Sequence, residues 1–288
     1  MSIRKPTLAG TWYPGSRQEC VNEIETFLNH KPLVTHLKGD IKAGIVPHAG
    51  WQFSGDLACN VFNILSKSSS EHPPDVIVIF GMHMPAGTRP VIMKEGGWDT
   101  PLGIIDVAED LGEKLASQIQ FTVETPNAFT PENTIEVQMP LVKYFFNGAK
   151  VLTIGPPAGP AAMEIGDTVV KTAETLGLRL IIVASTDLTH YGPNFGFSPA
   201  GSGRKAYEWV RDKNDRAVVE KMLAMDPEGV IAEGLSNHNA CCPGAAAAGI
   251  TAAKCLGAKK SELLGYSSSY EKNPGDTFVG YAGVVYAT

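Results

Sequence analysis

The pattern of apolar and polar positions predicts an alternation of strands and helices along the whole chain. Short apolar runs mark six candidate strands at 42–47, 75–81, 150–155, 178–185, 262–269 and 278–287. Longer amphipathic stretches mark candidate helices near 16–29, 55–67, 107–119, 130–146, 160–175, 202–224 and 243–256. Several of the strands are continuous Val/Ile/Leu runs, which is typical of strands covered on both faces. We therefore expect an α/β fold with a central, mostly parallel or mixed sheet flanked by helices.

The helix expected over 130–146 has a defined start and an internal break. Thr130 is a candidate N-cap with Pro131 at the first helical position. Pro140 lies within the apolar pattern, where it should kink or end the helix. The sequence contains neither an internal repeat nor a low-complexity linker, so we expect one domain over residues 1–288.

Composition narrows the class of protein. The chain has 288 residues, a formal net charge of −6 and no apolar run near the roughly 20 residues that span a bilayer. It lacks the excess of Lys and Arg that is typical of a nucleic-acid binder, and it has no apolar leader segment at its N-terminus. Five irregularly spaced cysteines do not indicate a disulfide framework. We expect a cytoplasmic protein that binds neither nucleic acid nor membrane; the oligomeric state stays open.

Three of the seven histidines directly follow apolar strands. His48 follows "GIVP", His83 follows "VIVIFGM", and His190 follows "LIIVASTDLT". Ligands of open α/β sheets bind at the carboxyl ends of the strands, and imidazole is the commonest metal ligand and acid–base group there. A packed, hydrogen-bonded ring is the ordinary alternative for each histidine alone. Asp187 is placed to orient His190, or it is simply a turn residue.

A cysteine pair precedes the Ala-rich helix expected at 243–256. Cys242 lies at its N-cap side, where the helix dipole should lower the thiol pKa and favour a metal-binding or nucleophilic thiolate. The alternative is a buried capping cysteine. Cys241 is expected to point elsewhere. Trp12, Tyr13, Trp51 and Tyr191 are expected to wall a pocket suited to a planar ligand.

An ordered set of motifs resembles the Memo family, also called AmmeMemoRadiSam system protein B. The set runs from "AGTWYPG" (9–15) through "PHAGW" (47–51), "GMHMP" (81–85), "TPLG" (100–103) and "ENTIEVQMP" (132–140) to "STDLTHYG" (185–192), "HNACCPG" (238–244) and "VGYAG" (279–283). The family is similar in fold to LigB-type class III extradiol dioxygenases, which hold non-haem Fe(II). The chain departs from the family in two motifs: Asn133 replaces a usual histidine, and Met82 and Met84 flank His83.

The resemblance implies one transition metal per chain, Fe(II) or Cu, with Zn as an alternative. It implies His48, His83 and Cys242 as metal ligands and His190 as a further, catalytic histidine of the pocket. Asp187, three residues before His190, is the second expected catalytic residue on its position alone. The resulting hypothesis is a metal-dependent oxidoreductase of unknown substrate. Two alternatives stay open: a protein that binds a small molecule or peptide in the strand-end pocket, as some members are described for phosphopeptides, and a hydrolase with a Cys242 nucleophile, His190 base and Asp187 orienter.

Overall fold

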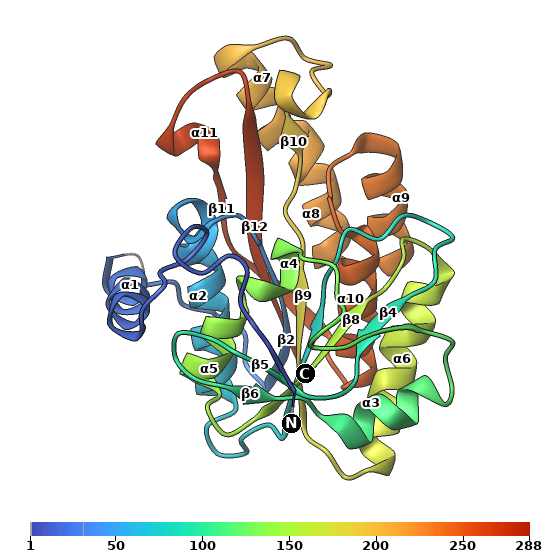
Figure 1. The fold of residues 1–288 in the computed structure, drawn as a ribbon. Coiled ribbons are helices and arrows are strands. Elements are labelled where there is room, and N and C mark those ends of the chain that lie inside the picture. The colour runs from blue at the N-terminus through green and yellow to red at the C-terminus, as the bar shows by residue number, and fades with distance from the viewer. Residues whose placement is uncertain (1, 31) are drawn as a thin grey trace.

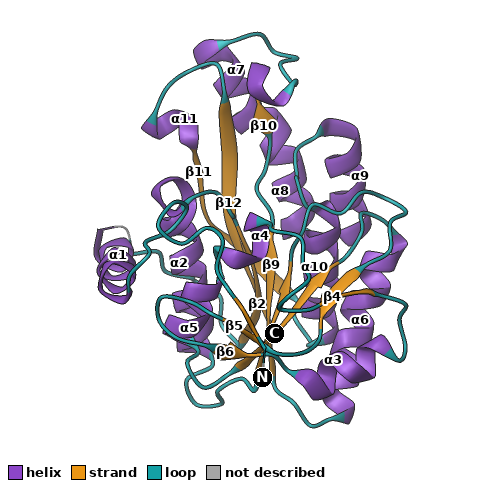
Figure 2. Cartoon of the chain, viewed as in Figure 1, coloured by secondary structure: helices purple, strands orange, loops and turns teal. Residues whose placement is uncertain are grey.

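A mixed sheet with helices on both faces forms the centre of the protein (Figures 1 and 2), which confirms the predicted fold class. The computed structural model describes residues 2–30 and 32–288. Within them, nine strands form the main sheet in the order β10-β12-β2-β9-β3-β8-β4-β7, with β11 paired to β12. A separate three-stranded sheet has the order β1-β5-β6 and uses Ile3–Arg4, Gly97–Trp98 and Ile105–Asp106.

The parallel centre of the main sheet consists of four of the predicted strands. They are β2 (Ile41–Val46), β9 (Leu180–Ser185), β3 (Val76–Phe80) and β8 (Lys150–Gly155). Almost every side chain in them is buried, because helices cover both faces and both sets of alternating side chains must be apolar. The register pairs Val46 with Ser185 and Phe80 with Ala184, so the carboxyl ends of three adjacent strands lie level.

Antiparallel strands extend both sides of this centre. On one side, β12 (Phe278–Ala287) pairs with β2 and carries β11 (Lys260–Ser268) and β10 (His190–Tyr191). On the other side, β4 (Val91–Met93) pairs antiparallel with β8, and β7 (Thr122–Glu124) pairs with β4. The short strands β4 to β7 and β10 have too few residues to show an alternating pattern and were not predicted.

The helices divide between the two faces of the sheet (Figure 1). One face carries α1 (Arg17–His30), α2 (Trp51–Ser68) and α5 (Met139–Phe145), and the other carries α3 (Glu109–Ala116), α6 (Pro160–Thr175) and α10 (Pro243–Cys255). The remaining helices are α4 (Asn133–Glu136), α7 (Gly203–Trp209), α8 (Asp215–Leu223), α9 (Pro227–Asn237) and α11 (Ser269–Lys272).

Two predicted helices differ in detail. The stretch 130–146 divides into α4 and α5, and Pro140 begins the second helix instead of kinking a single one. The first helix starts at Asn133, because the Glu132 side chain accepts hydrogen bonds from the free N–H groups of the first turn; Thr130 is not the cap. The stretch 202–224 is interrupted by a π-helical turn over Val210–Asn214 between α7 and α8.

Helix α10 packs unusually close to the sheet because its contact positions are small. A β-carbon on Gly249 would lie 2.6 Å from the Ala184 β-carbon of β9, and one on Gly166 of α6 would lie 2.4 Å from the Ala248 carbonyl oxygen. At the first turn, a β-carbon on Gly244 would lie 2.4 Å from the Pro156 carbonyl oxygen. This packing fixes the N-terminus of α10, and the cysteine pair before it, against the carboxyl ends of the strands.

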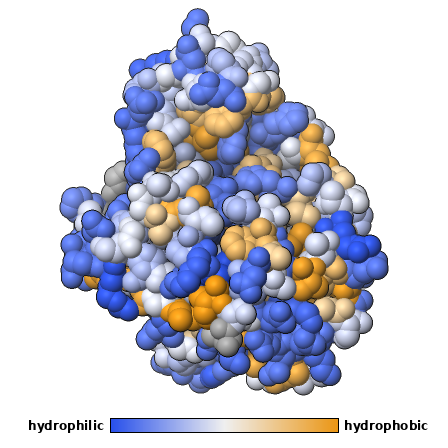
Figure 3. Space-filling view, in the orientation of Figure 1, coloured by the Kyte–Doolittle hydropathy of each residue, from blue (hydrophilic) through white to orange (hydrophobic). Residues whose placement is uncertain are grey.

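None of the described helices is long and apolar enough to cross a bilayer. On the face shown in Figure 3, apolar side chains occur in scattered patches between polar ones. Such dispersed apolar residues are ordinary for a folded chain.

Candidate metal centre

Three adjacent strands deliver the predicted residues to one edge of the sheet. β2 is followed by His48, β9 by Asp187, and β3 by His83. Pro47 ends β2 because it cannot donate to the ladder, so His48 stands just beyond the sheet. The hydrogen-bonded order β2-β9-β3 explains why residues 35 positions apart in the sequence meet: the ring centroids of His48 and His83 lie 5.3 Å apart, edge to face.

His48 is buried and its tautomer is set by Ser185. The Ser185 hydroxyl donates to the Thr134 carbonyl oxygen at 2.6 Å, so toward the His48 Nδ1, 3.1 Å away, it acts as acceptor. Nδ1 therefore carries the proton, and Nε2 faces the Cys241 sulfur at 3.2 Å. A histidine held at one nitrogen by a hydrogen-bond acceptor presents the other nitrogen to a metal. The backbone N–H of His48 also donates to Asp187 at 2.7 Å.

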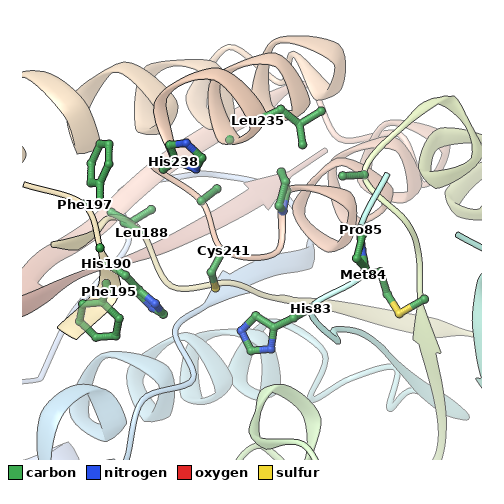
Figure 4. A pocket seen from close by; sticks show the side chains of 15 residues that line it. His83, Met84, Pro85, Leu188, His190, Phe195, Phe197, Leu235, His238 and Cys241 are labelled. Carbon is green, nitrogen blue, oxygen red and sulfur yellow. The ribbon is translucent and has the colours of Figure 1, made fainter. Parts of the chain in front are cut away.

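Both cysteines reach the site, and the expectation that Cys241 points elsewhere is wrong. The Cys241 N–H donates to the Asp187 carbonyl oxygen at 3.1 Å, which lays this residue along the turn after β9. Its sulfur accepts from the Asp187 N–H at 3.3 Å and lies 3.7 Å from the Cys242 sulfur. Figure 4 shows the Cys241 sulfur directed between His83 and His190. The "CC" dipeptide itself was the signal, but sequence alone could not show that both sulfurs face one space.

The two thiols have opposite acidities. Burial opposes ionisation of Cys241, but the hydrogen bond from Cys242 and the charge of His48 bring the Cys241 pKa well below its ordinary value. Burial and the neighbouring Cys241 raise the Cys242 pKa well above the ordinary value, so the lowered pKa predicted for Cys242 is found on its neighbour. Burial lowers the His48 pKa, but Asp187 and Cys241 outweigh it and raise it to about 9. Without a metal, His48 and Cys241 thus form an imidazolium–thiolate pair.

His83 joins the same group of donor side chains, and it lies on a loop whose backbone is strained. The residue before it, Met82, has φ of +67°, a left-handed conformation that a non-glycine side chain rarely adopts. The Met82 N–H donates to the Thr134 hydroxyl at 2.6 Å, which holds this conformation. Together, His48, His83, Cys241 and Cys242 offer four ligand atoms that all lie within 4.8 Å of one another.

His190 and Asp187 stand beside these donors. The His190 Nε2 lies 3.8 Å from an Asp187 carboxylate oxygen, too far for a hydrogen bond, and this buried nitrogen has no hydrogen-bond partner among the described residues. Burial lowers the His190 pKa, but Asp187 outweighs it and raises the pKa above its ordinary value. No hydrogen bond joins Cys242 to His190 within the described part of the chain.

Two cavities meet at the cluster. One, of about 490 Å³, is lined by Cys241, His238 and Leu235, among others, and is shown in Figure 4. The other, of about 470 Å³, is lined by Asp187, Trp12, Phe53, Phe278 and Tyr281, among others. His83, His190 and Phe195 line both cavities. Of the four donors, His83 is therefore reachable from both cavities and Cys241 from one.

Of the four aromatic residues predicted to wall a pocket, only Trp12 does so. Tyr13, Trp51 and Tyr191 are at most 3% exposed and lie in the core. Trp51 is drawn inward because its indole N–H donates to the Val137 carbonyl oxygen at 3.0 Å. The aromatic wall comes instead from Phe53, Phe195, Phe278 and Tyr281.

Comparison with known proteins assigns the family. The model of the family described as "Memo-like protein" matches residues 4–285. A MEMO1 family protein of Thermococcus onnurineus is 31% identical, with 99% of each chain covered, and one of Methanococcoides burtonii is 32% identical, with 98% of this chain and 99% of the relative covered. The chain belongs to the Memo family. An uncharacterized protein of Escherichia coli K12 with a solved structure covers 85% of this chain at 14% identity and a TM-score of 0.48, too low to support a conclusion.

The Memo relatives carry only the family name, so they assign a family and not a reaction. One departure from the usual Memo motif can now be placed. Asn133 donates its side-chain N–H to the His48 carbonyl oxygen at 3.0 Å and lines the cavity of about 470 Å³. In this Memo chain the amide thus braces the loop that carries His48, and it adds no fifth metal-binding side chain to the cluster.

Proposed function

We propose that this Memo-family chain is a metal-dependent oxidoreductase that holds one transition metal ion at the strand ends. The observation that carries the proposal is the set of four imidazole and sulfur donors within 4.8 Å at the junction of two cavities. Fe(II) or Cu is the expected ion, with Zn(II) as the alternative. Hard cations such as Mg²⁺ prefer oxygen ligands and do not match this donor set.

The residues present fit such an ion. His48 Nε2 is freed by the Ser185 hydrogen bond, and Cys241 favours the thiolate form that metals require. His48, His83 and Cys242 are the ligands that the sequence indicated, and the position of Cys241 adds a fourth donor. A metal bound there would supply Lewis acidity or a change of oxidation state.

Proton transfer would fall to His190. Its Nε2 has no hydrogen-bond partner among the described residues and its ring lines both cavities, so it can exchange a proton with a ligand in either. Asp187, 3.8 Å from that nitrogen, stabilises the charged ring by Coulombic attraction. Asp187 also fixes His48 through its backbone N–H, so one carboxylate positions both histidines.

Metal loading should release protons. Because the folded environment raises the His48 pKa to about 9, this ring carries a proton at pH 7 that an incoming metal must displace. We therefore expect metal affinity to increase with pH from 6 to 8. Calorimetric titration in buffers of different ionisation enthalpy measures the number of protons released; a value of zero would contradict this expectation.

A second candidate function is ligand binding without turnover, of a small molecule or a peptide. Three of the exposed large apolar side chains, Trp12, Phe195 and Leu235, line the two cavities. Exposed apolar groups around a cavity are common in binding sites. The described lining includes no Lys or Arg, the side chains that usually hold phosphate, so these cavities favour a ligand other than a phosphopeptide. Ligand binding that persists in His48→Ala, with no redox turnover, would favour this candidate.

A third candidate is a cysteine hydrolase, with a nucleophile different from the one first expected. The imidazolium–thiolate contact joins Cys241 to His48 at 3.2 Å. Rapid alkylation of Cys241 by iodoacetamide that added metal does not slow would favour this candidate. Protection of Cys241 by stoichiometric metal would favour the oxidoreductase.

The deciding experiment is elemental analysis of anaerobically purified protein. We expect about one metal ion per chain in the wild type and loss of the ion in His48→Ala and Cys242→Ala. Cys255→Ala, at an exposed cysteine on the last residue of α10, is the matched control and should retain the metal. Unchanged metal content in both site variants would overturn the proposal.

Within the same proposal, we place the protein in the cytoplasm, with neither nucleic acid nor membrane as a partner. The cysteines of the described chain are all free thiols, which suits a reducing compartment.

A further inference from the structure

The four donors are not held equally, and the difference begins with His48. Its side chain is 1% exposed, Ser185 holds one ring nitrogen, and Asp187 holds its backbone N–H. The other ring nitrogen faces Cys241. With its tautomer, rotamer and backbone all fixed, His48 is a preorganised ligand.

The two cysteines are fixed as firmly. Hydrogen bonds in both directions join Cys241 to Asp187, between backbone groups and from backbone N–H to sulfur. The Cys242 N–H donates to the Thr186 hydroxyl at 3.1 Å, and the following residue is Pro243 in the first turn of α10. Cys242 is 2% exposed, and the two sulfurs lie 3.7 Å apart. The cysteine pair therefore forms a rigid inner wall of the site.

His83 is held differently. It is an exposed residue of the loop after β3, whereas His48 and Cys242 are buried. Beyond its contacts with Cys241 and the edge of His48, no hydrogen bond from a described residue orients its ring. It also lines both cavities, whereas Cys241 lines one of them and the described lining of neither includes His48 or Cys242.

We propose that His48, Cys241 and Cys242 are the permanent ligands of the metal, and that His83 is an exchangeable fourth ligand. This inference rests on the proposed metal site. Four protein ligands close a tetrahedral ion, whereas a catalytic ion keeps an open position. Dissociation of the exposed imidazole opens that position without moving the buried core, and an incoming ligand from a cavity takes its place. The presence of two sulfur ligands also makes the site softer than a single thiolate would.

Cobalt(II) gives a test that needs no substrate. In anaerobic titrations, the intensity of the near-ultraviolet thiolate-to-cobalt charge-transfer band increases with the number of bound thiolates. We expect wild-type protein to show the intensity of two thiolates, and Cys241→Ser and Cys242→Ser each to show roughly half of it. Cys255→Ser should match the wild type, because this cysteine contacts Asp167 and not the cluster.

The His83→Ala variant separates the exchangeable ligand from the permanent ones. It should keep the two-thiolate band, change the visible ligand-field spectrum, and recover the wild-type spectrum when free imidazole is added. His48→Ala should bind cobalt more weakly than His83→Ala. Imidazole should not restore its wild-type spectrum, because position 48 is buried and closed to an added ligand.

The outcomes are distinct. A wild-type intensity of one thiolate overturns the binding of the metal by both cysteines and requires no variant to fold. Absence of recovery of His83→Ala by imidazole overturns the exchange of His83. Absence of binding of cobalt, iron, copper and zinc by the wild type overturns the proposed function itself, and the inference with it.

Discussion

Two buried polar clusters lie on either side of the turn between β9 and β10. They differ in how many of their hydrogen-bonding groups are paired within the protein. The first is the donor group of His48, Cys241 and Cys242, with His83 and His190 at the cavities. The second surrounds Asp215, which is fully buried and accepts hydrogen bonds from Thr189 and Tyr266, while Asn214 donates to the Thr189 hydroxyl. The turn joins them, since Asp187 belongs to the first cluster and Thr189 to the second.

The Asp215 cluster satisfies its own groups. The Thr189 N–H and hydroxyl both donate to one carboxylate oxygen, and the Tyr266 hydroxyl donates to the other at 2.7 Å. The π-helical turn at 210–214 shifts the helical register, so Asn214 and Asp215 both face inward. A β-carbon on Gly280 would lie 1.9 Å from the carboxylate, so glycine is required there. Neither of the two central cavities includes Asp215 in its lining.

A buried ionisable group with a shifted pKa therefore does not by itself mark a functional site. Burial raises the pKa of Asp215 to about 6 although three donors oppose this. Its hydrogen-bonding capacity is nevertheless used inside the protein, as expected of a structural group. In the first cluster, by contrast, His190 Nε2 has no hydrogen-bond partner among the described residues, and Cys241 lines a cavity.

The largest effect on stability is expected from Asp215→Ala. The substitution leaves the Thr189 and Tyr266 donors buried and unpaired, which should lower the free energy of unfolding by roughly 3–5 kcal/mol. Urea denaturation of the metal-free protein measures this change. Asp212→Ala, at an exposed residue of the same helical segment, is the control and should cost about 0.5 kcal/mol or less. A loss below 1 kcal/mol for Asp215→Ala would contradict the structural role.

The pH dependence of stability should also originate in this cluster. Between about pH 4 and pH 6 the unfolded chain loses the Asp215 proton while the folded protein keeps it, because the folded pKa is about 6 against an ordinary value of 3.8. The folded state then binds more protons, so this group makes the free energy of unfolding fall as pH rises, by about 3 kcal/mol in total.

Asp215→Asn should remove this part of the pH profile while keeping the shape of the side chain. The difference between the wild-type and variant profiles from urea denaturation isolates the contribution of Asp215. Parallel profiles between pH 4 and pH 6 would show that Asp215 does not titrate there.

The smallest expected effect is a change in metal affinity at the first cluster. Ser185→Ala removes the acceptor that sets the His48 tautomer, so metal affinity should fall about tenfold. Competition with a chromogenic chelator measures the affinity. Ser66→Ala is the control, since Ser66 donates to the Phe145 carbonyl oxygen away from the site. Equal affinities of the two variants would indicate that Ser185 does not orient His48.

The sequence predicted the arrangement that matters most for the site. The apolar runs at 42–47, 75–81 and 178–185 became β2, β3 and β9, and the residues placed at their ends meet as expected. This succeeded because carboxyl ends of parallel strands share one edge of a sheet. The short edge strands and the helix α9 were not predicted, because a few residues or a weakly amphipathic segment carry little periodic signal.

Residue types and local spacing alone determined which chemistry is available here: imidazoles after apolar strands, a cysteine pair before a helix, and an alternation that requires an α/β sheet. Only the tertiary structure decided how these groups are used. The acidic thiol is Cys241 and not Cys242, because Cys242 donates a hydrogen bond to the Cys241 sulfur and His48, which follows another strand, stabilises its charge. The pocket walls, the Ser185 contact and the exposure of His83 likewise depend on segments far apart in the sequence, which no local pattern can bring together.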